Sequence, residues 1–234
     1  MGWPRRWHVP GLIYHIIIRG NNRQAVFLEE EDYRRYLSYL YHYKRKYCFK
    51  IFAFCLMTNH VHLLIKVYSV RISKIMQSLT ISHTKHYHFK YRCCGHVWQG
   101  RFKSPIVSDD EYLLTTMAYI EQNPLRAKMV QRIGDYFWSS YKMNIGRREY
   151  KLIDRKENPA WLNLGMDNEE RIRKYKDYLA QRIVEDKTKE IQRGTQGQGN
   201  YFSKKFEEQM RELLPKKRKR GRPRKTDFSI NQLM

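Results

Sequence analysis

Two histidines separated by a single residue, His60 and His62, form the most specific chemical pattern in the sequence. Side chains of a β-strand alternate between its two faces, so residues i and i+2 project from one face about 7 Å apart. Two imidazoles at that spacing can converge on one divalent metal ion. The spacing is equally compatible with exposed or hydrogen-bonded histidines that bind no metal. The pattern therefore indicates a strand with two histidines on one face and leaves their role open.

Tyr119 and Asn123 form a second candidate pair, four residues apart. Positions i and i+4 of a helix share one face, so a phenol and an amide oxygen there can address one point. Thr116 and Arg126 extend the same polar stripe. A purely structural interpretation stays open for each residue. Tyr119 is then one half-buried tyrosine among 18, and Asn123 caps a helix that begins at Pro124.

The segments that carry these residues predict an α+β fold. Runs of β-branched and apolar residues indicate strands, whereas apolar residues at helical spacing indicate amphipathic helices. Ser108 and Glu111 form a capping-box signature at the start of the last helix, and Pro124 predicts a kink or stop at its end. The expected strands are residues 11–19, 49–56, 60–67 and 106–107, and the expected helices are residues 31–47, 71–91 and 108–123, packed on an antiparallel sheet.

Composition divides the chain into three parts. Residues 1–145 hold the α+β domain. Residues 146–200 predict a helical extension, with a helix over 168–184, and then a flexible glycine-rich linker. Residues 201–234 predict a short amphipathic helix and a basic tail, in which eight of the ten residues from 216 to 225 are Lys or Arg.

The charge indicates a polyanionic partner. Lys and Arg number 46 against 23 Asp and Glu, a net charge of +23, and 14% of the residues are aromatic. Basic groups release counterions when they neutralise phosphates, and aromatic rings stack on the exposed bases of single strands. An anionic membrane surface or a place in the ribosome are the alternatives, but no amphipathic lipid-facing helix stands out. We therefore expect a nucleic acid as the partner.

The remaining composition predicts a soluble protein of a reducing compartment. The longest clean apolar run, residues 51–57, is far too short to cross a bilayer. Cysteines that form no C-x-x-C pair favour the cytosol, and the His and Cys residues between 83 and 96 fit no standard zinc spacing. The four cysteines are Cys48, Cys55, Cys93 and Cys94.

Four motifs in register resemble one known family. They are GLIYHIIIRGN from Gly11, FCLMTNHVHLL from Phe54, WQGRF from Trp98 and YIEQNPLRA from Tyr119. Together they look like the REP-associated tyrosine transposases, which belong to the single-tyrosine HUH nucleases. The resemblance covers residues 5–145 in order and extends to the basic tail. It implies a ferredoxin-like antiparallel sheet that carries the two histidines, with a tyrosine-bearing helix across it.

The resemblance also implies roles for individual residues. His60 and His62 would bind a divalent metal, with Asn123 as third ligand, and Tyr119 would be the nucleophile. Mg²⁺ is the implied ion, while two imidazoles and an amide also suit Mn²⁺.

Further residues are candidate DNA contacts, and each also has an interpretation that involves no DNA. A solvated surface position is the alternative for most of them, and core packing for Trp98 and the neighbouring Phe102. The segment from Arg220 to Arg224 resembles an AT-hook core that would read an A·T-rich minor groove, or it is a general phosphate-seeking tail. The candidate contacts are Arg5, Arg6, His15, Arg19, Arg23, Trp98, Arg101, Lys103, Arg126, Lys219, Arg220, Arg222 and Arg224.

The function that the resemblance implies is metal-dependent nicking and rejoining of single-stranded DNA at hairpin-forming repeated extragenic palindromes, through a 5′-phosphotyrosine. The expected partner is single-stranded or hairpin DNA, with no membrane, for a monomer or homodimer in the bacterial cytoplasm at the nucleoid. The alternatives are a non-catalytic DNA-binding regulator on the same fold and an RNA-binding protein.

Overall fold

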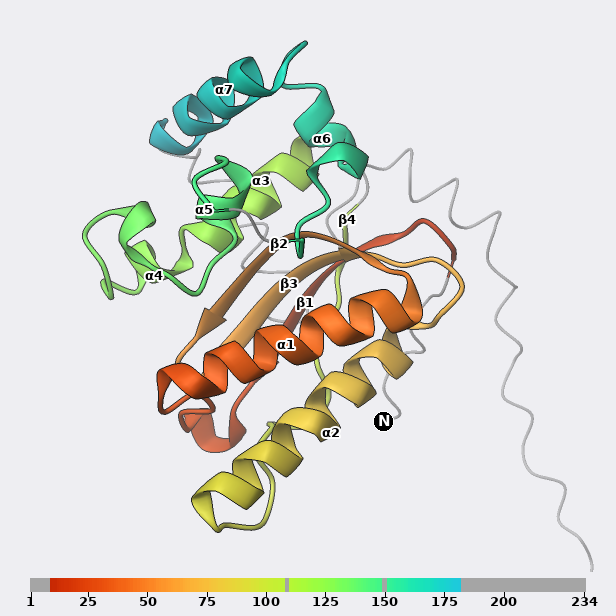
Figure 1. The fold of residues 1–234 in the computed structure, drawn as a ribbon, viewed down its shortest axis with the longest axis vertical. Coiled ribbons are helices and arrows are strands. Elements are labelled where there is room, and N and C mark those ends of the chain that lie inside the picture. The colour runs from red at the N-terminus through yellow and green to blue at the C-terminus, as the bar shows by residue number, and fades with distance from the viewer. Residues whose placement is uncertain (1–8, 108–109, 149–150, 182–234) are drawn as a thin grey trace, which may run out of the picture.

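The computed structural model describes residues 9–107, 110–148 and 151–181. Within them the chain forms a four-stranded antiparallel sheet in the order β2-β3-β1-β4, with helices on both faces (Figure 1). Short 3-10 helices cover Asn21–Arg23, Ile133–Asp135 and Arg155–Glu157. The strands are β1 (Ile13–Arg19), β2 (Lys50–Met57), β3 (His60–Lys66) and β4 (Ile106–Val107), and the helices are α1 (Glu30–Tyr47), α2 (Ile72–Tyr91), α3 (Asp110–Glu121), α4 (Asn123–Arg126), α5 (Tyr141–Asn144), α6 (Pro159–Leu162) and α7 (Asn168–Ala180).

The inner strand β3 sets the register of the histidine pair. Its antiparallel pairing with β1 places His60 opposite Arg19 and His62 opposite Ile17. Directly opposed residues of an antiparallel pair share a face. Both histidines therefore lie on the same face of the sheet as Arg19, while Val61 between them is fully buried on the other face.

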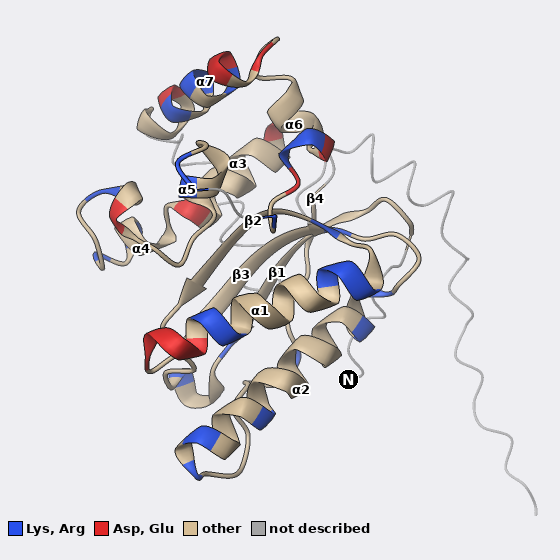
Figure 2. Cartoon of the chain, viewed as in Figure 1, with Lys and Arg blue, Asp and Glu red and all other residues tan. Residues whose placement is uncertain are grey.

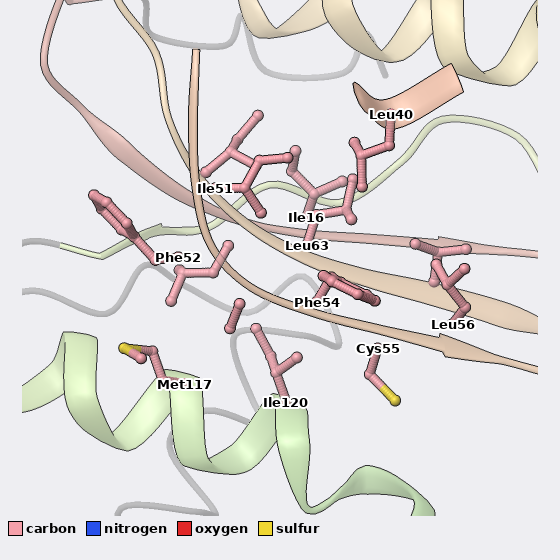
Figure 3. Close-up of a cluster of buried hydrophobic side chains, with 14 of the residues drawn as sticks. Ile16, Leu40, Ile51, Phe52, Phe54, Cys55, Leu56, Leu63, Met117 and Ile120 are labelled. Carbon is pink, nitrogen blue, oxygen red and sulfur yellow. The ribbon is translucent and has the colours of Figure 1, made fainter. Parts of the chain in front are cut away.

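Apolar side chains fill both sides of the sheet. Ile16 of β1 and Leu63 of β3 belong to the same buried cluster as Leu40 of α1. Figure 3 shows Leu40 on one side of the strands and Met117 and Ile120 of α3 on the other. Burial of each such side chain contributes roughly 1.5–3 kcal/mol. This packing holds α3 against the face that carries the histidines.

The chain that follows α4 extends the sheet along the outer side of β2. Leu56 N donates a hydrogen bond to Trp138 O, and Ser140 N donates one to Phe54 O, each at 2.9 Å. The chain then continues through α5 and α6 to α7, and these helices gather around α3 (Figure 1). The helix α3 is thus enclosed between the sheet and the residues that follow it.

The α+β class and the antiparallel sheet are confirmed. The expected strands and helices appear with bounds that differ by a few residues. The stop at Pro124 is confirmed as well, because α3 ends at Glu121 and a new helix begins at Asn123. The helix expected over 168–184 is α7, which ends at Ala180.

Several expectations fall outside the described residues. They concern the capping residue Ser108, the N-terminal Arg5 and Arg6, the glycine-rich linker, and the tail with Lys219, Arg220, Arg222 and Arg224. In the part of the chain that is described, no helix is long and apolar enough to cross a membrane.

Candidate active site

The two histidines of β3 lie side by side on one face of the sheet. The ring centroids of His60 and His62 are 5.0 Å apart, and their planes meet at 77°. His62 is buried, with 3% of its surface exposed, while His60 is half-buried at the start of the strand. The strand geometry expected from the H-x-H spacing is therefore present.

Both rings are oriented by a hydrogen bond at Nδ1. His60 Nδ1 lies 2.6 Å from Asn59 Oδ1, which can only accept, so the imidazole donates. His62 Nδ1 lies 2.9 Å from Nε2 of His15 on the neighbouring strand. With both Nδ1 atoms engaged, Nε2 is the atom of each ring that is left to bind a metal.

Burial keeps these imidazoles neutral. It lowers the pKa of His60 to about 4, with the charge of Arg19 as a smaller cause. It lowers the pKa of His62 well below the usual value, and charge on His15 would lower it further. Burial alone lowers the pKa of His15 to about 3. Neutral imidazole is the form that binds metals, so the pair needs to lose no proton near pH 7.

Tyr119 of α3 faces the same site from above the sheet. Its ring centroid lies 6.0 Å from that of His62 and 6.0 Å from that of His15. The guanidinium of Arg126 lies 5.0 Å from the centre of the Tyr119 ring, and Tyr119 is 8% exposed. The phenol and both histidines therefore come together within a single chain.

Asn123 is hydrogen-bonded to the last turn of α3. Its side-chain Nδ2 donates to the carbonyl oxygens of Tyr119 at 2.8 Å and Ile120 at 3.4 Å. The residue that caps α4 is Gln122, so the alternative in which Asn123 is the N-cap is wrong. Since Nδ2 bonds to the backbone, Oδ1 is the atom of Asn123 that could serve as a metal ligand.

The donor set fits a divalent cation with open coordination positions. The described residues contain no cluster of three or more His, Cys, Asp or Glu side chains suited to a metal. A cation here would thus bind two neutral imidazoles and complete its shell with neutral or substrate oxygens. Positions left to a substrate distinguish a reactive metal site from a structural one, which is closed by protein ligands.

Comparison with known proteins identifies this domain. Residues 8–123, which contain both histidines, Tyr119 and Asn123, match the family described as "Transposase IS200 like". The domain that these residues form belongs to the IS200-like transposase family. The resemblance stated from the motifs is confirmed, and the matched domain ends at Asn123.

Two similar proteins have more specific descriptions than the family. A REP-associated tyrosine transposase from Haemophilus influenzae is 28% identical over 116 residues, which are 44% of this chain and 65% of that protein, just under two thirds of its length. The solved structure of a REP-associated tyrosine transposase bound to a REP hairpin matches with a TM-score of 0.56 and 17% identity. That match covers 66% of this chain and 98% of the other, and at this identity it establishes a shared fold.

Positive charge borders the histidines of this transposase domain. Arg19 lies opposite His60, and Lys103 pairs with Ile17, the residue that faces His62 across β1 and β3. Burial and the charge of Arg19 lower the pKa of Lys103, which reflects how near the two cations lie. The helix α3 itself carries no Lys or Arg (Figure 2). The cations beside the site therefore come from β1, from the segment before β4 and from α4.

The other expected DNA contacts differ in exposure. Arg23 and Arg101 are exposed. Trp98 is 9% exposed and belongs to the buried core, with Phe102 packed partly against it, so core packing describes both. His15 is fully buried, so it contacts His62 and not a surface-bound strand.

A groove of about 910 Å³ lies on the other side of β1, against α2. Lys74, Lys85 and Arg101 line it, together with Trp98 and Phe102. None of the proposed metal ligands lines this groove.

Sequence reasoning missed two kinds of residue. Asn59 was not singled out, although an asparagine directly before H-x-H is well placed to accept a hydrogen bond from the first imidazole. Glu121, two residues after Tyr119, was not singled out at all. It is fully buried and hydrogen-bonded by three side chains from later in the chain.

Proposed function

We propose that this protein is a metal-dependent endonuclease and strand transferase for single-stranded DNA, with Tyr119 as its nucleophile. The observation that carries the proposal is the convergence of the Tyr119 phenol with two neutral histidines, at a ring distance of 6.0 Å from His62. Membership of a transposase family supports DNA as the substrate. The activity follows from what these groups can do to a phosphodiester.

A phosphodiester resists attack because its negative charge repels nucleophiles and its leaving group is a poor alkoxide. His60, His62 and Asn123 would hold Mg²⁺ or Mn²⁺, and the bound ion would supply positive charge to neutralise the non-bridging oxygens of the phosphate. Asn59 and His15 keep the two imidazoles oriented for that task. The protein then has to present one nucleophile along the line of attack.

Tyr119 would supply that nucleophile. The phenol loses its proton to water, aided by the positive charge of Arg126 over its ring. A bond forms between the Tyr119 oxygen and phosphorus, the bond from phosphorus to O3′ breaks, and O3′ leaves as a hydroxyl after taking a proton from water. The product is a 5′-phosphotyrosine and a free 3′-OH. Attack by a 3′-OH on the phosphotyrosine reverses the step and joins strands.

The proposed substrate is a hairpin-forming repeated extragenic palindrome with a single-stranded flank. Arg19, Lys103 and Arg126 would bind the strand beside the reacting phosphate. A structural relative was solved bound to a REP hairpin, which supports this class of DNA. Residues 219–224 of the tail would add contacts to a flanking duplex.

The test is incubation of the protein with hairpin oligonucleotides that carry a label at either end, in Mg²⁺ or Mn²⁺. A 5′-phosphotyrosine predicts that a 3′ label becomes attached to the protein, whereas a 5′ label appears on a shorter free strand. Tyr119→Phe should bind DNA and form no adduct. Tyr43→Phe, which removes a tyrosine hydroxyl far from the site, is the matched control.

Two results would replace the proposal. DNA binding with no adduct in either metal would favour a non-catalytic DNA-binding regulator. Equal affinity for a matched RNA hairpin, again without an adduct, would favour an RNA-binding protein. An undiminished adduct yield from Tyr119→Phe would remove Tyr119 from the mechanism.

A further inference from the structure

Glu121 is a buried carboxyl group on the helix that carries Tyr119. The two residues are two positions apart, so their side chains point about 200° apart around α3. Tyr119 faces the histidines, and Glu121 faces the residues that follow the transposase domain. Glu121 is fully buried, where an unpartnered charge would be strongly unfavourable.

Three donors from two other helical segments surround this carboxyl group. Ser140 Oγ at 2.5 Å and Asn144 Nδ2 at 2.7 Å donate to Glu121 Oε1. Tyr175 of α7 donates from its hydroxyl to Oε2 at 2.8 Å. Both carboxyl oxygens are thereby satisfied, and α3 is joined to Ser140, to α5 and to α7 through a single side chain.

The helix α7 contacts α3 at two further points. The hydroxyls of Tyr178 and Thr115 are hydrogen-bonded at 2.8 Å. Gln122 Nε2 donates to the carbonyl oxygen of Leu179 at 3.0 Å. With the bond to Tyr175, these contacts run from Thr115 of α3 to Gln122, the residue directly after α3, and so lie on both sides of Tyr119 in the sequence.

The ring of Tyr175 also packs against Trp161 of α6, with centroids 5.4 Å apart. The hydroxyl of Tyr175 therefore has a fixed position from which to donate. We call the set of Ser140, Asn144, Tyr175 and Tyr178 the clasp.

Burial and hydrogen bonding have opposite effects on the pKa of Glu121. Burial raises its pKa to about 7, while the hydrogen bonds from Ser140, Asn144 and Tyr175 oppose that rise. Cys55 of β2 and Tyr141 of α5 also feel the charge of Glu121, and burial raises the pKa of each. Among the described residues, none of the hydrogen-bond partners of Glu121 is a Lys or Arg.

We propose that the clasp sets the position of α3, and that Glu121 and Tyr175 are positioning residues for strand cleavage by Tyr119. All four residues of the clasp lie beyond Asn123, where the match to the transposase family ends. This inference rests on the proposed function. In-line attack needs near-contact geometry, and a misplacement of about 1 Å can slow such a reaction about 100-fold. Weakening the contacts between α3 and the clasp therefore changes the rate at which bound DNA is cleaved.

The test compares two variants that each lose one tyrosine hydroxyl. Tyr175→Phe removes the hydroxyl that donates to Glu121 and keeps the ring against Trp161. Tyr43→Phe removes a hydroxyl that bonds Ser82 at 2.8 Å between α1 and α2. Both full-length variants are assayed for DNA affinity, for the single-turnover cleavage rate at saturating DNA, and for hydrogen exchange of the α3 amides.

We expect Tyr175→Phe to cleave about 10- to 100-fold more slowly at unchanged DNA affinity, with faster exchange across α3. Tyr43→Phe should match the wild type in both. Equal behaviour of the two variants would overturn the proposal. If the wild-type protein forms no adduct, the proposed function fails, and the exchange of α3 still decides whether the clasp holds it. Glu121→Gln, which keeps the size of the side chain, should slow cleavage as Tyr175→Phe does.

Discussion

His15 Nε2 lies 2.9 Å from Nδ1 of His62, and the two rings stack with their centroids 5.2 Å apart. The contact is diagonal across β1 and β3, since His15 itself lies opposite Leu64. A buried imidazole thus holds the ring of a proposed metal ligand. This makes His15 part of the support of the site.

The first prediction concerns that support. His15→Phe keeps an aromatic ring in place but leaves His62 Nδ1 without its partner. Loss of such an orienting group typically lowers metal affinity about 10- to 100-fold. Calorimetric titration with Mn²⁺ should show a decrease of this size. His42→Phe, at an exposed position of α1, is the control, and unchanged Mn²⁺ affinity in His15→Phe would assign the contact to packing alone.

The second prediction concerns metal removal. If His60 and His62 share one cation, His60→Ala and His62→Ala should each abolish most of the cleavage, and EDTA should do so for the wild type. Asn123→Ala should be milder, because water can replace an amide ligand. Cleavage is measured across a Mn²⁺ titration. Full cleavage by the wild type in EDTA would contradict a metal site. An unchanged Mn²⁺ dependence of cleavage in Asn123→Ala would limit Asn123 to its hydrogen bonds with the end of α3.

The third prediction concerns pH and Glu121. The carboxyl pKa is raised from 4.5 to about 7 on folding. Between these values the folded state holds a proton that the unfolded state has lost, so the contribution of Glu121 to stability falls as pH rises through this range. The size is about 3 kcal/mol. His15, His60 and His62 have lowered pKa values and impose the opposite slope below pH 6.5.

A difference measurement separates the two effects. The free energy of unfolding of Glu121→Gln is compared with that of the wild type from pH 4.5 to 8 by denaturant titration. The histidines cancel in the difference, so the wild type should lose stability relative to the variant as pH rises. A difference that stays constant across this range would mean that Glu121 ionises normally in the folded protein.

The fourth prediction concerns the basic tail. Each phosphate contact contributes a slope of roughly −0.9 in duplex or −0.7 in single strands to the dependence of log affinity on log salt. Deletion of residues 216–234 should therefore weaken DNA binding and flatten this dependence, with the cleavage rate at saturating DNA nearly unchanged. Binding is measured from 50 to about 200 mM salt on A·T-rich and G·C-rich flanking duplexes. A larger loss on A·T-rich DNA supports minor-groove reading, equal losses indicate a polycation, and a collapse of cleavage would place the tail in the active site.

Local patterns in the sequence were sufficient for the strands and the long helices, whereas the roles of the candidate reactive groups came from the resemblance to a family. Runs of β-branched and apolar residues predicted β1 and β3, and helical spacing predicted α3, because each pattern depends on neighbours in the chain. The spacing of His60 and His62 predicted a shared face for the same reason. Pro124 marked the end of the tyrosine helix since it cannot donate a backbone hydrogen bond.

Only the tertiary structure decided how those groups are held. His15 looked like a surface contact, and the pairing of β1 with β3 turned it toward His62, 47 residues away. Trp98 looked able to stack on bases, and packing buried it. Glu121 gave no signal because its partners lie 19 to 54 residues later in the chain. Burial and hydrogen bonding between distant segments depend on how elements pack, and no spacing within one element reveals that.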